Sequence, residues 1–310
     1  LADILEIPVI TSMIAIDVLP TDNKYNFGFL GAYGHRYANF VIAKSDLLIT
    51  IGSRMDIRQT GANREVFASG AKIVRIDIDE NELTNKIKDD EVQIVGNLKE
   101  ILPRLKRYFE RTKLKSFVAW LNVCTEIKEL FFDKDSSLPN DFIRKMSLMI
   151  PENSVITTDV GQNQVWVSQS FKVKKNQTIL YSGGHGSMGY SLPASIGAFY
   201  ASKGKKVFCI NGDGGIQMNL QELQFIAREK LPIKIIIFNN KSLGMIRHFQ
   251  DMYFHANYAQ TVVGKGYEPS NFSKLSKAFD IQYHCVDKYE NLNKDLFDGD
   301  FPCVVEFVLN

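Results

Sequence analysis

Two short polar segments in the second half of the chain follow apolar runs. A Gly-Asp-Gly motif at 212–214 follows the run 207–210, and Asn240 follows the run 233–238. If these runs are neighbouring parallel strands, Asp213 and Asn240 project from one carboxyl edge of a sheet, where open α/β folds bind ligands. A carboxylate, an amide oxygen and backbone carbonyls make a hard oxygen site. Such a site suits Mg²⁺, which completes its coordination with phosphate oxygens.

The segment between the two motifs has the pattern of a helix start. Asn219 is in position to cap it, with Glu222 three residues on. Strand, helix and strand in this order predict a right-handed crossover. Taken alone, the first motif is also typical of a β-turn and the second of a helix cap. Their occurrence together at matching strand ends favours the ion site.

Length and composition predict an ordinary globular protein. A chain of 310 residues is long enough for about two domains. Lys plus Arg is 37 against 35 for Asp plus Glu, so nothing points to nucleic acid or a membrane surface as partner. No apolar run is long enough to span a bilayer. The four cysteines show no Cys-x-x-Cys spacing. Cys209 and Cys303 lie in apolar strand patterns, so we expect buried thiols in a reducing cytoplasm.

Apolar runs alternate with helical patterns along the whole chain, which predicts an α/β protein with two doubly wound parallel sheets. We expect a central domain at 1–110, a helical linker at 111–137 and a second domain at 138–310. In the first domain the clearest strands are 45–52 and 72–78. In the second, strands are expected at 154–158, 178–181, 207–210, 234–238 and 303–309.

Further motifs accompany the first two. They are Asp-Val-Gly-Gln-Asn at 159–163, the glycine-rich segment 182–189 and Leu-Gly-Met at 243–245. Together with the Gly-Asp-Gly and Asn-Asn motifs they resemble thiamine diphosphate (ThDP) enzymes, and the wider sequence resembles the acetolactate synthase large, catalytic subunit. The similarity covers essentially the whole chain. It implies a ThDP diphosphate-binding domain after a central domain related to FAD- and nucleotide-binding domains.

The resemblance also implies the residues that hold the cofactor. Met188 aligns with the apolar wedge that bends ThDP, and Gly186 with a carbonyl acceptor for its amino group. The Mg²⁺ ligands would be Asp213, Asn240 and the backbone carbonyl of Ser242. The complete set of cofactor neighbours implied is Gly161, Gln162, Asn163, Gly186, Ser187, Met188, Gly212, Asp213, Gly214, Gly215, Asn240, Gly244 and Met245. The structural alternatives are a plain βα turn at 159–163, a tight loop at 182–189 whose glycines only ease packing, and a core methionine at 245.

Three positions depart from the acetolactate synthase pattern. In the first domain, Asn97 replaces an Asp that is usual after the Val-Gly pair. Asn163 stands where these enzymes usually have His. Phe249 stands where they carry a substrate-selecting Trp, and with Met245 it would line the substrate pocket. The expected activity is that of a ThDP- and Mg²⁺-dependent 2-oxo acid decarboxylase/carboligase with pyruvate as donor. The alternatives are a simple decarboxylase, a carboligase with a sugar or CoA acceptor, and a non-catalytic nucleotide-binding module.

In the first domain, Arg54, Asp56 and Asp77 align with polar contacts to FAD. The alternatives there are an empty domain and a regulatory nucleotide. The resemblance further implies that a pyrimidine-binding domain precedes this chain, and that its glutamate activates the cofactor of a partner subunit. We therefore expect a homodimer or tetramer and no activity from the chain alone. The resemblance identifies no catalytic residue within this chain, so its catalytic residues are unknown.

Overall fold

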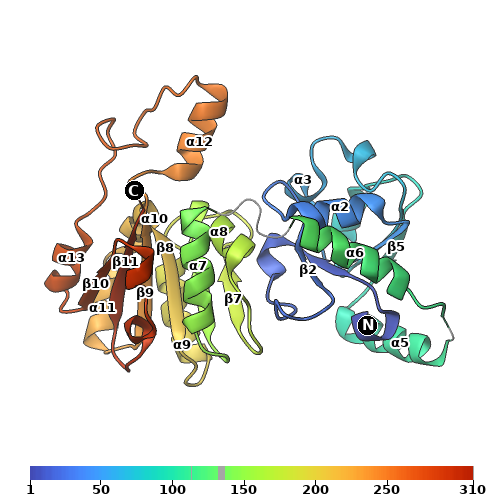
Figure 1. The fold of residues 1–310 in the computed structure, drawn as a ribbon, viewed down its shortest axis with the longest axis horizontal. Helices are drawn as coiled ribbons and strands as arrows, with labels where there is room; N and C mark the ends of the chain where they lie inside the picture. The colour runs from blue at the N-terminus through green and yellow to red at the C-terminus, as the bar shows by residue number, and fades with distance from the viewer. Residues whose placement is uncertain (113, 132–136, 310) are drawn as a thin grey trace. The chain divides into compact units, whose positions relative to one another are not determined.

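The computed structural model describes residues 1–112, 114–131 and 137–309. It divides into two compact units, Leu1–Asp135 and Ser136–Asn310 (Figure 1). All of the strand pairs found in the described residues are parallel, which confirms the predicted α/β class. The predicted domain edge near 133–137 falls mostly outside the described residues.

The first unit holds two small parallel sheets with the strand orders β1-β2 and β3-β4-β5. Its strands are β1 (Val9–Thr11), β2 (Asn26–Phe29), β3 (Leu47–Ile51), β4 (Lys72–Asp77) and β5 (Val92–Val95). Its α-helices are α1 (Ala2–Leu5), α2 (Arg36–Lys44), α3 (Ile57–Thr60), α4 (Glu80–Thr84), α5 (Leu98–Arg111) and α6 (Val118–Phe131). Helix α6 packs on α2, where Cys124 is buried beside Phe27 and Val41.

The second unit has one six-stranded sheet with the order β10-β11-β9-β8-β6-β7. Its strands are β6 (Val155–Thr158), β7 (Thr178–Tyr181), β8 (Val207–Gly212), β9 (Ile233–Asn239), β10 (Gln282–Val286) and β11 (Cys303–Val308). Its α-helices are α7 (Leu138–Met149), α8 (Gln162–Ser170), α9 (Ser191–Ala201), α10 (Asp213–Ile216), α11 (Glu222–Arg228), α12 (Gly244–Tyr253) and α13 (Phe272–Ala278).

Helices cover both faces of this sheet because the central strands are apolar on both sides. One side of β9 (Ile233, Ile235 and Ile237) packs with Leu192 of α9 and Leu223 of α11. On the other side, Phe238 stacks on Phe307 of β11 with ring centroids 5.0 Å apart, and Phe307 meets Phe142 of α7. The sheet is therefore doubly wound.

The predicted helix cap at Asn219 is wrong. The Gly-Asp-Gly motif runs directly into α10, with Gly212 as N-cap, and Asn219 ends a short 3₁₀ segment. The next helix begins at Glu222 without a side-chain cap. The Asn219 amide instead donates to the Gly189 carbonyl oxygen at 2.7 Å, because that loop lies against it.

No helix within the described ranges has both the length and the apolar character needed to cross a membrane. Of the cysteines, Cys124, Cys209 and Cys303 are buried free thiols, and Cys285 is an exposed one.

Candidate cofactor site

The site lies where the chain changes direction across the second sheet. Strand β6 has β7 on one side and β8 on the other, so the connections leaving β6 and β7 run to opposite sides of it. In open α/β sheets, the carboxyl ends of the strands at such a switch point form the ligand-binding crevice. Asp159 follows β6 and Asp213 follows β8, while Asn240 follows the next strand, β9.

Asp213 is a buried acid with an incompletely satisfied carboxylate. It is 2% exposed, and within the described structure its Oδ2 has no hydrogen-bond partner. Burial raises its pKa to about 6, although hydrogen bonds from the Tyr267 hydroxyl and from backbone N–H groups, including that of Ser242, oppose the rise. A buried anionic oxygen without a partner costs free energy unless a cation or donor reaches it.

Asn240 lies beside this carboxylate. Its Oδ1 accepts the backbone N–H of Ser242 at 3.2 Å, and that same N–H also reaches the Asp213 carboxylate. Its Nδ2 donates to Gln162 Oε1 at 2.8 Å. The structure therefore places the Asn240–Ser242 turn against the Asp213 carboxylate. The Ser242 hydroxyl in this turn is buried and has no partner among the described residues.

The glycine-rich loop before α9 approaches the same place. The Met188 side chain, Leu243 and the Tyr267 hydroxyl all surround Gly214. The backbone of Gly186 has a φ of 67°, a conformation that glycine adopts without strain. The Ser187 amide donates to Ser182 Oγ at 3.1 Å, which folds the loop back on itself.

The turn 159–163 points its two amide side chains in different directions. Gln162 faces Asn240, as described above. Asn163 is 2% exposed, and its Nδ2 donates to the Asp159 carbonyl oxygen at 2.7 Å, so its amide group stabilises the turn from inside. Gly161 is the N-cap of α8 and has a φ of 148°, a conformation that glycine adopts without strain and other residues rarely adopt.

Helix α12 carries the predicted substrate-pocket residues. Met245 and Phe249 are four positions apart and so share one side of the helix. Met245 is half-buried, whereas Phe249 is 48% exposed and stacks on Tyr253. Figure 1 shows α12 standing out from the body of the unit, joined to α13 by a long loop. Tyr267 belongs to this loop, which spans residues 254–271.

The three residues predicted to contact FAD are engaged in local interactions of the first unit. Asp56 caps α3 and pairs with Arg58 at 2.9 Å. Arg54 lies 3.4 Å from Glu82, and Asp77 accepts the backbone N–H of Asp79. FAD binding by these residues stays a prediction.

The site contains two residues to which the sequence assigned no individual role, Asp159 and Tyr267. The sequence predicts only that the glycine-containing loop 258–268, which carries Tyr267, folds over the site. Asp159 belongs to a recognised motif and follows a buried strand as Asp213 does, which is a usable signal. Tyr267 lies more than 50 positions from Asp213, on a loop without a regular pattern. Only the folded chain reveals that its hydroxyl reaches the acid.

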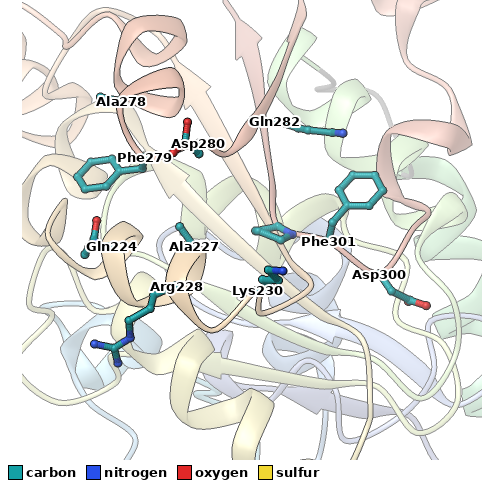
Figure 2. A pocket seen from close by; sticks show the side chains of 11 residues that line it. Gln224, Ala227, Arg228, Lys230, Ala278, Phe279, Asp280, Gln282, Asp300 and Phe301 are labelled. Carbon is teal, nitrogen blue, oxygen red and sulfur yellow. The ribbon is translucent and has the colours of Figure 1, made fainter.

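A separate hollow of about 550 Å³ lies at the opposite, amino edge of the sheet (Figure 2). Its exposed charged residues are of both signs, Arg228 and Lys230 with Asp280 and Asp300. This mixture gives no preference for a phosphate. Because it lies at the amino edge of the sheet, the hollow is distinct from the site at the carboxyl edge.

Comparison with known sequences identifies the family. Residues 159–307 match the family model described as thiamine pyrophosphate enzyme, C-terminal TPP binding domain, and residues 1–105 match the central domain of thiamine pyrophosphate enzymes. Thiamine pyrophosphate is another name for ThDP. The chain belongs to the thiamine pyrophosphate enzyme family.

Relatives from distant organisms agree with this assignment. The acetolactate synthase large subunit of Porphyra purpurea is 36% identical over 96% of the chain and 51% of its own length. The probable acetolactate synthase large subunit of Methanocaldococcus jannaschii is 34% identical over 100% of the chain and 54% of its length. Acetolactate synthase 1, chloroplastic, of Nicotiana tabacum is 40% identical over 87% of the chain and 41% of its own length. The chain thus spans about half the length of these relatives.

Proposed function

We propose that this chain provides the Mg²⁺- and diphosphate-binding half of the active site of an acetolactate synthase-like 2-oxo acid decarboxylase/carboligase. The observation that carries the proposal is the buried Asp213 carboxylate, whose Oδ2 lacks a partner in the described structure and which lies beside Asn240. The donor atoms are all oxygens, with one formal negative charge, which fits Mg²⁺ bound through a phosphate.

The chain's own residues would hold and orient the cofactor. Asp213 and the Asn240 amide oxygen would bind the cation, with the backbone carbonyl of Ser242 as third ligand. The backbone N–H groups of Gly214 and Gly215, at the start of α10, would face the diphosphate. Gln162 would keep Asn240 oriented by accepting its amide N–H. Met188 would press against the cofactor from the loop before α9.

Bound ThDP would supply the electron sink that decarboxylation of a 2-oxo acid requires. The donor proposed is pyruvate. Met245 and Phe249 would form one wall of the pocket for the second, acceptor substrate. A sugar or CoA acceptor is the second candidate, because Phe249 is smaller than Trp and would leave a larger acceptor pocket. Exchanging Phe249→Trp should then shift product formation toward acetolactate.

The proposal extends to the assembly. The relatives are named large subunits and are about twice as long as this chain. We propose that the activating glutamate belongs to a pyrimidine-binding domain of a partner subunit in a homodimer or tetramer. Buried free thiols at Cys124, Cys209 and Cys303 are compatible with a reducing compartment such as the cytoplasm.

A product assay tests this function. The 310-residue chain, supplied with pyruvate, ThDP and Mg²⁺, should give no turnover, because it lacks the glutamate. A version extended by the upstream pyrimidine-binding domain should release CO₂ and form acetolactate or, with an added acceptor, the corresponding ligation product. Turnover by the 310-residue chain alone would refute the missing-glutamate argument. No CO₂ release by the extended version would refute the proposed activity.

A further inference from the structure

Asp159 is a fully buried acid at the centre of the candidate site. Its exposed fraction is 0%, and burial raises the pKa of its carboxyl group above the ordinary value. The backbone N–H groups of Gly189 and Ser191 donate to its carboxylate at 3.1 and 3.2 Å. The N–H groups of Val160 and Tyr190 also stabilise the carboxylate. Four backbone donors therefore converge on one side chain.

Three of these donors, Gly189, Tyr190 and Ser191, belong to the segment that directly follows Met188 and begins α9. Negative charge at the start of an 11-residue helix is favoured by the helix dipole, so the carboxylate and α9 stabilise each other. Asp159 itself is anchored to the sheet, because its backbone N–H donates to the Ile210 carbonyl oxygen of β8 at 2.9 Å. The loop before α9 is in this way tied to β6 and β8.

The same carboxylate abuts the turn after β8. A Cβ atom added to Gly215 would lie 1.8 Å from Asp159 Oδ2, far inside the contact distance of a carbon and an oxygen. Only a glycine can therefore stand at 215 while Asp159 keeps its place. Asp159 therefore lies between the segment that follows Met188 and the turn that contains Asp213 and Gly214, and its contacts with both fix the distance between them.

We propose that Asp159 is a positioning residue that sets the spacing between Met188 and the Asp213–Gly215 turn. It acts through these residues and contacts neither cofactor nor substrate. The inference rests on the proposed function, since it assumes that the two segments hold ThDP and Mg²⁺ between them. The coupling of position 159 to position 215 is specific to this geometry and can be measured.

The test uses the variants Asp159→Asn, Asp159→Ala, Gly215→Ala and the double variant of the two alanine changes. Binding of ThDP in the presence of Mg²⁺ is measured by titration calorimetry, and the melting temperature is measured without either ligand. Asp159→Asn keeps the size of the side chain but turns an N–H₂ group toward the backbone donors. It should lower the ThDP affinity about tenfold, the effect of losing roughly one hydrogen bond to a charged group.

Gly215→Ala should also lower the affinity, because its methyl group displaces the carboxylate. In the Asp159→Ala background that group is absent, so the added methyl should cost little more, and the two effects should not add. Ser147→Ala is the control. Ser147 is equally buried and accepts the Lys172 N–H at 3.0 Å, but its partners lie outside the site. It should lower the melting temperature and leave ThDP affinity unchanged.

Each outcome has a separate meaning. If the unaltered chain binds no ThDP, the proposed function fails and the positioning role with it. If the unaltered chain binds ThDP and Asp159→Asn binds it within twofold, the function stands and the positioning role is refuted. Simple addition of the Asp159→Ala and Gly215→Ala effects would refute the coupling. If Asp159→Asn also loses stability, its affinity alone cannot separate positioning from folding. The affinity of Gly215→Ala, which keeps Asp159, then decides whether Asp159 has the positioning role.

Discussion

Gly244 contacts the group that orients Asn240. A Cβ atom at this position would lie 1.9 Å from Gln162 Oε1, the atom that accepts the Asn240 amide N–H. Because Gln162 is a flexible side chain, it can move aside at little cost in stability. What it would lose is its hydrogen bond to Asn240. A methyl group added at residue 244 can therefore leave the fold intact and still disturb the site.

Gly244→Ala should therefore lower the affinity for Mg²⁺ and ThDP about tenfold, because a freed Asn240 no longer presents its oxygen in one direction. Its melting temperature should change little. Gly197→Ala is the matched control, since a Cβ at this position of α9 meets nothing within 4 Å. It should leave affinity unchanged and raise stability slightly. Equal affinities for both variants would contradict the role given to Gln162.

At the scale of elements, β9 carries both the core and the site. Its isoleucines pack under α9 and α11, and its carboxyl end leads to Asn240. One residue does not fit the apolar pattern. Lys234 is 2% exposed, and its ammonium group donates to the Phe301 carbonyl oxygen at 2.9 Å and lies over the Phe301 ring. Burial lowers the pKa of Lys234.

The lowered pKa of Lys234 determines the direction in which the free energy of unfolding changes with pH. Above the folded-state pKa and below the ordinary value of 10.5, the unfolded chain binds more protons than the folded one, so stability rises with pH. Lys234→Met removes the buried charge and should raise the free energy of unfolding at pH 7 by roughly 1 kcal/mol. Its advantage over the unaltered chain should shrink as pH rises toward 10.5. Urea unfolding at several pH values measures this, and an advantage that grows with pH would contradict it.

At the scale of the whole molecule, the sequence predicts the class and most of the second sheet. Strands β6, β7, β8, β9 and β11 lie where the sequence predicts them. The central strands β8, β9 and β11 are the clearest of these, because strands buried on both faces are largely apolar. Strand β10 was not predicted, since four of its five residues are exposed or half-buried and its sequence, Gln-Tyr-His-Cys-Val, lacks an apolar run.

The site was predictable only in part, and for a physical reason. Motifs reveal residues that follow strands, such as Asp213 and Asn240. They do not reveal which partner a side chain selects after folding. Asn219 has the pattern of a cap and instead bonds to the Gly189 carbonyl, and Asn163 turns inward to its own turn. Tyr267 reaches Asp213 through tertiary contact alone.

Calorimetric titration of the chain with ThDP, with Mg²⁺ present and then with the metal removed by EDTA, tests the role of the cation directly. We predict one ThDP bound per chain with Mg²⁺ and no binding after chelation. Asp213→Asn and Asn240→Ala should each weaken ThDP binding by at least about 100-fold, because each removes a direct ligand of the cation. ThDP binding that survives both EDTA and these substitutions would contradict the central claim that Asp213 and Asn240 anchor the diphosphate through a metal ion.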